Sequence, residues 1–86
     1  MTLDKKPLKD IIGKLVVTKE GKRLGIVKDI TFETRTGELI QMLLKDPTPY
    51  TRNLNLEISS SKDVLVPYNT IIAIGDFVVV SEEDLL

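Results

Sequence analysis

The stretch GKRLGIVKDITFETRTGELIQMLLK, residues 21–45, predicts one β-hairpin and decides the fold class. Two apolar segments, residues 24–33 and 38–45, flank a Thr-Arg-Thr-Gly turn whose glycine can adopt a positive φ. Lys28 interrupts the alternation of the first segment, so we expect a β-bulge at Lys28 and Asp29 that bends the strand. The hairpin contains no histidine, no cysteine and no obvious nucleophile.

Further short strands are expected on both sides of this hairpin. They cover residues 14–18, 63–66, 71–74 and 77–81, separated by turns rich in Gly, Asp, Asn and Pro. Strands at this spacing without a long helix indicate an all-β domain. We expect a small six-stranded closed barrel, because closure removes exposed strand edges.

The connection over residues 46–62 is longer than an ordinary loop. Its two prolines, Pro47 and Pro49, remove donors that a central strand needs. Within it, Leu54, Leu56 and Ile58 alternate with polar residues, which predicts an extra short strand over residues 54–58. The expected fold is therefore a barrel with a long insert that carries this strand.

With 86 residues the chain makes one domain, with the barrel at about residues 11–81 and an acidic tail at 82–86. A chain this short buries about 60–65% of its unfolded surface, so the core is thin and pairing into a homodimer would add stability. The sequence has no signal-peptide pattern, and its apolar runs are far shorter than the ~20 residues of a membrane span. We expect a cytoplasmic protein.

A search for catalytic chemistry returns weak candidates. The chain has no histidine and no cysteine, which removes the commonest general base and the ordinary zinc ligands. The Ser61-Lys62 pair lies in a run of three serines beside a turn. Three adjacent acids, residues 82–84, cannot all converge on one ion if the tail is extended. We expect no enzyme activity, no metal and no cofactor.

The charge distribution is uneven. Residues 1–28 hold eight Lys or Arg and three acids, a net charge of +5, whereas residues 29–86 hold four and ten, a net charge of −6. One interpretation is a nucleic-acid patch formed by Lys19, Lys22, Arg23 and Lys28. The alternative is that folding brings the acidic half next to the basic half. Single-strand binders interleave aromatic residues with cations, and we expect Phe32 and Phe77 in the core instead.

The insert also carries residue types that favour protein interfaces. Tyr50 and Arg52 are types enriched at binding hot spots, and they precede the Leu54, Leu56 and Ile58 stripe. Either a second subunit or partner covers this stripe, with strand-edge pairing as its mode, or the stripe packs over the end of its own barrel. Leu85 and Leu86, after the three acids, either join the same interface or fray.

Two segments carry a family pattern, GKLVVTKEGKRLGIVKDITFETRTGELIQMLL and DVLVPYNTIIAIGDFVVV, with a variable insert between them. The matching residues are Gly13-Lys14, Gly21, Gly25-Ile26-Val27, Asp29-Ile30, Thr36-Gly37, Val66-Pro67-Tyr68 and Ile74-Gly75-Asp76. In this order they resemble the PRC-barrel family, named for the photosynthetic reaction centre H subunit and shared by the ribosome maturation factor RimM. The resemblance covers about residues 11–81, nearly the whole chain.

The chain looks most like the stand-alone PRC-barrel proteins of archaea. This resemblance implies a six-stranded closed β-barrel and a homodimeric, non-enzymatic adaptor. Some members of that group act in FtsZ-based cell division by binding the SepF-type membrane anchor, so recruitment to the division site is implied as well. The alternative is a RimM-like barrel that binds RNA or the ribosome through the patch at residues 19–28.

Overall fold

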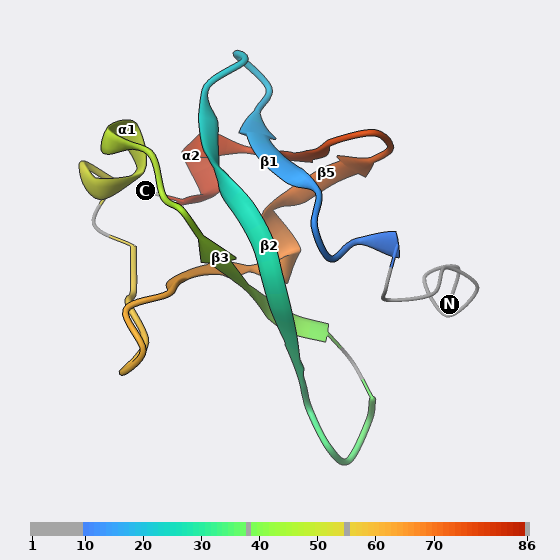
Figure 1. Cartoon of the computed structure of the whole chain (residues 1–86). Helices are drawn as coiled ribbons and strands as arrows, with labels where there is room; N and C mark the ends of the chain where they lie inside the picture. The colour runs from blue at the N-terminus through green and yellow to red at the C-terminus, as the bar shows by residue number, and fades with distance from the viewer. Residues whose placement is uncertain (1–9, 38, 55, 86) are drawn as a thin grey trace.

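The computed structural model describes residues 10–37, 39–54 and 56–85 (Figure 1). Short strands dominate, and the two α-helices have four residues each. In chain order the elements are β1 (Leu15–Thr18), β2 (Arg23–Phe32), β3 (Leu39–Lys45), α1 (Pro49–Arg52), β4 (Val64–Pro67), η3 (Tyr68–Thr70), β5 (Ile71–Ile74), β6 (Val78–Val80) and α2 (Glu82–Leu85).

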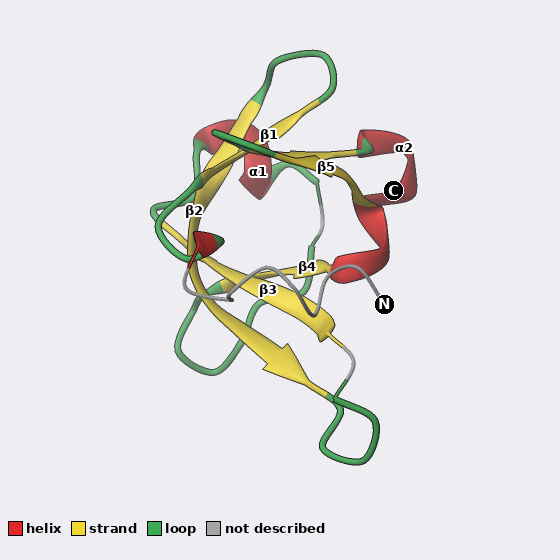
Figure 2. Cartoon of the chain, turned by 90° about the vertical axis from the view of Figure 1, so that its right-hand side faces the viewer, coloured by secondary structure: helices red, strands yellow, loops and turns green. Residues whose placement is uncertain are grey.

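All six strands belong to one sheet with the order β4-β3-β2-β1-β6-β5. Strands β1 and β6 run parallel, and the other neighbours are antiparallel. The sheet is strongly curled (Figure 2). These observations confirm the prediction of a six-stranded all-β domain.

The prediction of a closed barrel needs correction. In the described chain β4 and β5 are the two edges of the sheet and share no ladder, and η3 connects them. Pro67 at the end of β4 has no N–H to donate, and its carbonyl accepts the Thr70 hydroxyl at 2.7 Å. The chain therefore turns through η3 at the place where a closing ladder would begin.

The β2–β3 hairpin forms as its sequence predicts. The register passes from Val27 opposite Leu44 directly to Asp29 opposite Leu43, so Lys28 is the extra residue of a bulge. Gly37 has a φ of 74° in the connecting turn, a conformation that glycine adopts without strain. This hairpin and its neighbours position one apolar core.

The core is a single cluster of buried aliphatic side chains. Its members are Ile11, Val16, Leu24, Val27, Ile30, Met42, Leu44, Leu54, Val64, Val66, Val78, Val80 and Leu85. Phe32 and Phe77, expected in the core, are largely exposed instead. A register shift precedes Phe32 at the end of β2, and Phe77 lies in the β5–β6 turn, so strand alternation does not govern either side chain.

The insert folds differently from the expected strand. Thr48 caps α1 by accepting the Thr51 N–H, and Pro49 provides the first helical residue. The hydroxyl of Thr48 donates to the Arg23 carbonyl at 2.6 Å, and that of Thr51 donates to the Leu24 carbonyl at 2.7 Å. Over residues 54–58, where we expected a strand, the described residues form one bridge, from Ile58 to Val64. The Thr48 and Thr51 hydroxyls thus attach α1 to β2, and the described part of residues 54–58 forms no seventh strand of the sheet.

Candidate protein-interaction site

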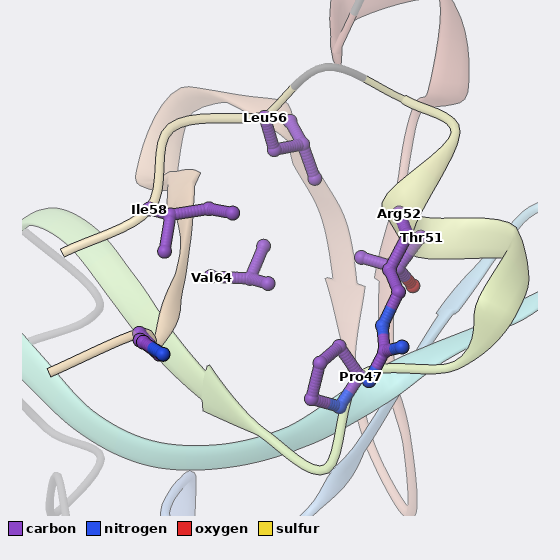
Figure 3. A pocket seen from close by; sticks show the side chains of 7 residues that line it. Pro47, Thr51, Arg52, Leu56, Ile58 and Val64 are labelled. Atoms are coloured by element: carbon purple, nitrogen blue, oxygen red, sulfur yellow. The ribbon is translucent and has the colours of Figure 1, made fainter.

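The insert and the start of β4 enclose an open groove of about 520 Å³ (Figure 3). Most of its wall is apolar, and two cations lie among the apolar groups. The lining residues are Pro47, Thr51, Arg52, Leu56, Ile58, Lys62 and Val64. Arg52, Ile58 and Lys62 are exposed, so a ligand in the groove can reach them without any rearrangement of the core.

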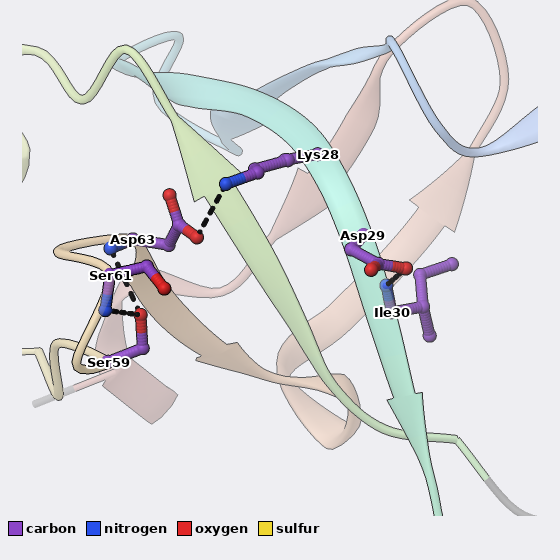
Figure 4. Close-up of polar contacts among 6 residues, drawn as sticks. All are labelled: Lys28, Asp29, Ile30, Ser59, Ser61 and Asp63. Carbon is purple, nitrogen blue, oxygen red and sulfur yellow. Dashed lines mark hydrogen bonds and ion pairs between the residues drawn. The ribbon is translucent and has the colours of Figure 1, made fainter.

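A tight turn over residues 59–63 positions Ile58 and Lys62. The Ser59 hydroxyl accepts the N–H of Ser61 at 3.2 Å and that of Asp63 at 3.1 Å (Figure 4). The backbone N–H of Ser59 donates to the Asp63 carbonyl at 2.9 Å. Lys62 has a φ of 67° within the turn, a left-handed conformation that is uncommon for lysine. The serines of this segment thus act as turn formers.

An ion pair attaches this turn to the sheet. Lys28, the bulge residue of β2, donates to the Asp63 carboxylate at 3.0 Å. The carboxylate is mostly buried, whereas about half of the lysine side chain is exposed. The bulge therefore positions one wall of the groove, although Lys28 lies far from the insert in sequence.

The edge of β4 beside the groove is partly occupied. The N–H of Leu65 donates to the Glu57 carbonyl at 2.8 Å, and the Asp63 carbonyl accepts Ser59, while Pro67 has no donor. A partner strand has to displace residues 57–59 before it pairs here. Strand-edge pairing at the insert is therefore disfavoured, and the groove presents side chains for docking.

The predicted interface residues separate into two groups. Arg52, Leu56 and Ile58 line the groove, and Leu56 also borders a second hollow of about 340 Å³ beside α2. Leu54 is only 7% exposed and belongs to the core, as the alternative of packing within its own chain expects. Leu85 is buried in the same core, and Leu86 lies outside the described residues.

Tyr50 is half-buried and contacts α2 and the β1–β2 turn. Its hydroxyl hydrogen-bonds to the Glu82 carboxylate, which, together with burial and the charge of Glu82, raises the pKa of Tyr50 to about 12. The Lys22 ammonium lies 5.3 Å from the centre of the Tyr50 ring, a cation–π contact. Tyr50 therefore connects the insert to α2 and to the β1–β2 turn.

The acidic C-terminal segment lies against the basic patch predicted at residues 19–28. Lys19 contacts Glu83 at 3.2 Å, and this hydrogen bond and the charge of Glu83 raise the pKa of Lys19. Lys22 faces Tyr50, and Lys28 faces Asp63. Residues 82–85 form α2 instead of an extended tail. The folded chain thus brings residues of its second half, two of them acidic, next to three cations of the patch, while the fourth, Arg23, is exposed.

Sequence patterns missed part of the groove. The sequence pattern predicts only that Pro47 interrupts a strand and that Val64 belongs to one, and Lys62 enters it only as part of the weak Ser61-Lys62 catalytic candidate. The position of Lys62 depends on the serine-capped turn and its positive φ, for which the sequence carries the weak signal of three consecutive serines. Ile72 and Phe77 were also missed as exposed apolar residues.

Comparisons with known proteins agree with this architecture. The model of the PRC-barrel domain matches residues 4–86. The uncharacterized protein MJ1118 of Methanocaldococcus jannaschii is 30% identical over 83 residues, which cover 96% of this chain and 89% of that protein. Neither α-helix of the described chain has the length and apolar composition of a membrane span. With six strands in the order described above and a family match over almost its full length, the chain belongs to the PRC-barrel domain family.

Proposed function

We propose that this protein is a non-enzymatic adaptor that docks a segment of another protein in the groove of the insert. The observation that carries the proposal is the combination of apolar and cationic side chains in one open groove. Leu56, Ile58 and Val64 supply the apolar wall, and Arg52 and Lys62 supply the charge.

The groove chemistry defines the partner segment. An apolar side chain of the partner loses water against Leu56 and Ile58, and its carboxylates pair with Arg52 and Lys62. Arginine is the stronger of the two cations for this task because its planar fork binds carboxylates in a bidentate way. The partner segment is therefore apolar and acidic, and it binds by its side chains because the neighbouring β4 edge is occupied.

Family membership and the archaeal relative support a more specific form of the proposal. In this form the protein is a cytoplasmic homodimer of an archaeal cell that acts in FtsZ-based division. Its partner is a SepF-type membrane anchor, which recruits it to the division site. The RNA- or ribosome-associated alternative uses the patch at residues 19–28, where three of the four cations contact groups of their own chain.

The test is a calorimetric titration of the purified SepF-type anchor from the same organism into the protein. Arg52→Glu and Ile58→Asp change exposed groove residues, and we expect each to weaken binding by about tenfold or more. Arg35→Glu and Ile12→Asp are the matched controls, since both residues are exposed and neither lines the groove. Equal affinity in all four variants, or loss in the controls, contradicts docking in the groove. The RNA-associated alternative predicts a different result. The protein then binds transfer RNA and not the anchor, and this binding is weakened by salt and lost in Arg23→Glu.

A further inference from the structure

The hollow of about 340 Å³ beside α2 adjoins the groove, because Leu56 lines both of them. Two pairs of neighbouring residues are divided between them in the same way. On β4, Val64 lines the groove and Leu65 lines the hollow, and in the insert Ile58 lines the groove and Glu57 lines the hollow. The groove and the hollow are therefore two compartments of one surface that meet at Leu56.

The two compartments carry opposite charges. Arg52 and Lys62 are the charged residues among the described lining of the groove, whereas Glu57 and Asp84 are those of the hollow. All four side chains are exposed, and within the described ranges none of them forms an ion pair with another described residue. The surface therefore changes the sign of its charge at Leu56, and both signs are accessible to a ligand.

The hollow combines apolar walls with two carboxylates. Leu56, Leu65 and Leu85 contribute apolar groups, and Glu57 and Asp84 contribute the charge. A lysine or arginine side chain has the same combination, since an apolar stem carries its cationic head. Its stem can contact the leucines while its head pairs with the carboxylates. A bare metal ion fits less well, because calcium takes six to eight oxygen ligands and the described residues bring no three acidic side chains together.

We propose that the hollow is a second compartment of the docking site and takes a lysine or arginine side chain of the partner segment. This inference rests on the proposed function, in which the acidic and apolar residues of the same segment occupy the groove. The segment then carries acidic, apolar and basic residues in this order or its reverse, with the apolar residue at Leu56. A wholly acidic segment is repelled by the hollow, and a wholly basic one is repelled by the groove.

The test selects binders of the purified wild-type protein from a display library of random short peptides. We expect the enriched peptides to carry Asp or Glu on one side of an apolar residue and Lys or Arg on the other side. Enrichment of acidic and apolar peptides without a basic residue overturns the assignment of the hollow but agrees with docking in the groove. No enrichment, or the same peptides on Arg52→Glu, contradicts docking in the groove and the inference with it.

Reversal of the hollow's charge gives a change of specificity that loss of folding cannot imitate. In Glu57→Lys combined with Asp84→Lys, we expect the selected peptides to carry an acidic residue where the wild type selects a basic one. Asp10→Lys combined with Asp76→Lys is the matched control, because both residues are exposed and neither lines the groove or the hollow. This control makes the same change in net charge and should keep the wild-type preference.

An unchanged preference in the hollow variant, or a changed one in the control, overturns the inference. Circular dichroism checks that the variants are folded. Glu57→Gln combined with Asp84→Asn is the milder pair if the reversed charges unfold the chain, and it should lose the preference for a basic residue.

Calorimetric titration of one selected peptide measures the size of the effect. Alanine in place of the basic residue of the peptide is expected to weaken binding to the wild type by about two- to fivefold, which is the range of an exposed ion pair. The same alanine peptide should bind the hollow variant at least as tightly as the selected peptide does. An equal loss of affinity in both proteins would show that the basic residue binds outside the hollow.

Discussion

Lys28 of β2 and Asp63, the residue before β4, are joined across the intervening strand β3, with 3.0 Å between the ammonium and carboxylate groups (Figure 4). The pair has a counterpart in Lys19 and Glu83, which lie 3.2 Å apart. Both lysine side chains are 48% exposed, but the Asp63 side chain is 11% exposed and that of Glu83 is 80% exposed. The two pairs therefore differ mainly in how far water screens the carboxylate.

Removal of the lysine charge is expected to have unequal effects at these pairs. Lys28→Met lowers the free energy of unfolding by about 1 kcal/mol, because the partly buried Asp63 loses its counter-charge. Lys19→Met has a smaller effect, because water solvates Glu83 in either case. Urea unfolding of both variants measures the difference. A larger loss for Lys19→Met would show that burial of the carboxylate does not decide the strength of these pairs.

The phenol of Tyr50 is expected to titrate well above the ordinary value of 10. Its hydrogen bond to Glu82 raises the pKa to about 12, and burial raises the pKa of Tyr68, the other tyrosine of the chain. An alkaline titration followed by phenolate absorbance should therefore show that Tyr50 is still protonated at pH 10 and that Tyr68 ionises above the ordinary tyrosine value. Glu82→Gln should lower the pKa of Tyr50 and leave that of Tyr68 unchanged. Ionisation of both tyrosines near pH 10 in the wild type would contradict the Tyr50–Glu82 contact.

The same contact predicts one contribution to the pH dependence of stability at alkaline pH. The unfolded chain loses the Tyr50 proton near pH 10, and the folded chain retains it until about pH 12. The stabilisation that this difference supplies is thus complete below pH 10 and is lost as the pH rises through 12. Unfolding by urea at pH 9 and 11 should show a smaller decline for Glu82→Gln than for the wild type. An equal fall in the free energy of unfolding for both proteins would show that the Tyr50–Glu82 contact does not contribute to the loss of stability at alkaline pH.

Two glycines provide a matched test of the packing between β2 and β3. A Cβ on Gly25 lies 2.9 Å from the backbone carbonyl oxygen of Lys45, so Gly25→Ala forces the strands apart and costs about 1–3 kcal/mol. A Cβ on Gly75 meets no atom within 4 Å, so Gly75→Ala leaves stability unchanged or raises it by up to about 1 kcal/mol. Thermal unfolding of both variants checks the contrast, and equal melting temperatures would contradict the close approach at Gly25.

An aspartate should have different effects on folding at Leu54 and at Ile58. Leu54→Asp places a carboxylate in the core and is expected to unfold the domain, because the buried charge finds no partner among the core aliphatic residues. Ile58→Asp adds the charge to an exposed side chain and should leave the fold intact. Circular dichroism of the two variants measures this directly. If the Leu54→Asp protein is folded, Leu54 is not a core residue, and it becomes again a candidate for the partner or dimer interface.

The hairpin of β2 and β3 was predictable because local residues determine it. The Lys28 bulge follows from interrupted alternation, and Gly37 supplies the turn conformation. Patterning over short apolar segments also identified the six strands. Closure was not predictable in this way, because the distance between β4 and β5 depends on η3 and on Pro67.

The candidate site was only partly predictable, since tertiary contacts override its local patterns. The alternation of Leu54, Leu56 and Ile58 is present in the sequence, but Leu54 belongs to the core, whereas Leu56 and Ile58 line the groove. Thr48 and Thr51 bind β2 carbonyls, and these long-range contacts, which local patterns do not show, position helix α1 before residues 54–58. Lys62 acquires its position from a turn that Asp63 and Lys28 hold in place.

Chemical-shift mapping of the wild-type protein tests the groove most directly. Isotope-labelled protein is titrated with the purified SepF-type anchor, and the amide shifts are followed residue by residue. Docking in the groove predicts that the largest changes fall on the lining residues between Pro47 and Val64 and disappear with Arg52→Glu. Changes centred on residues 19–28, or the same changes in Arg52→Glu, would contradict it.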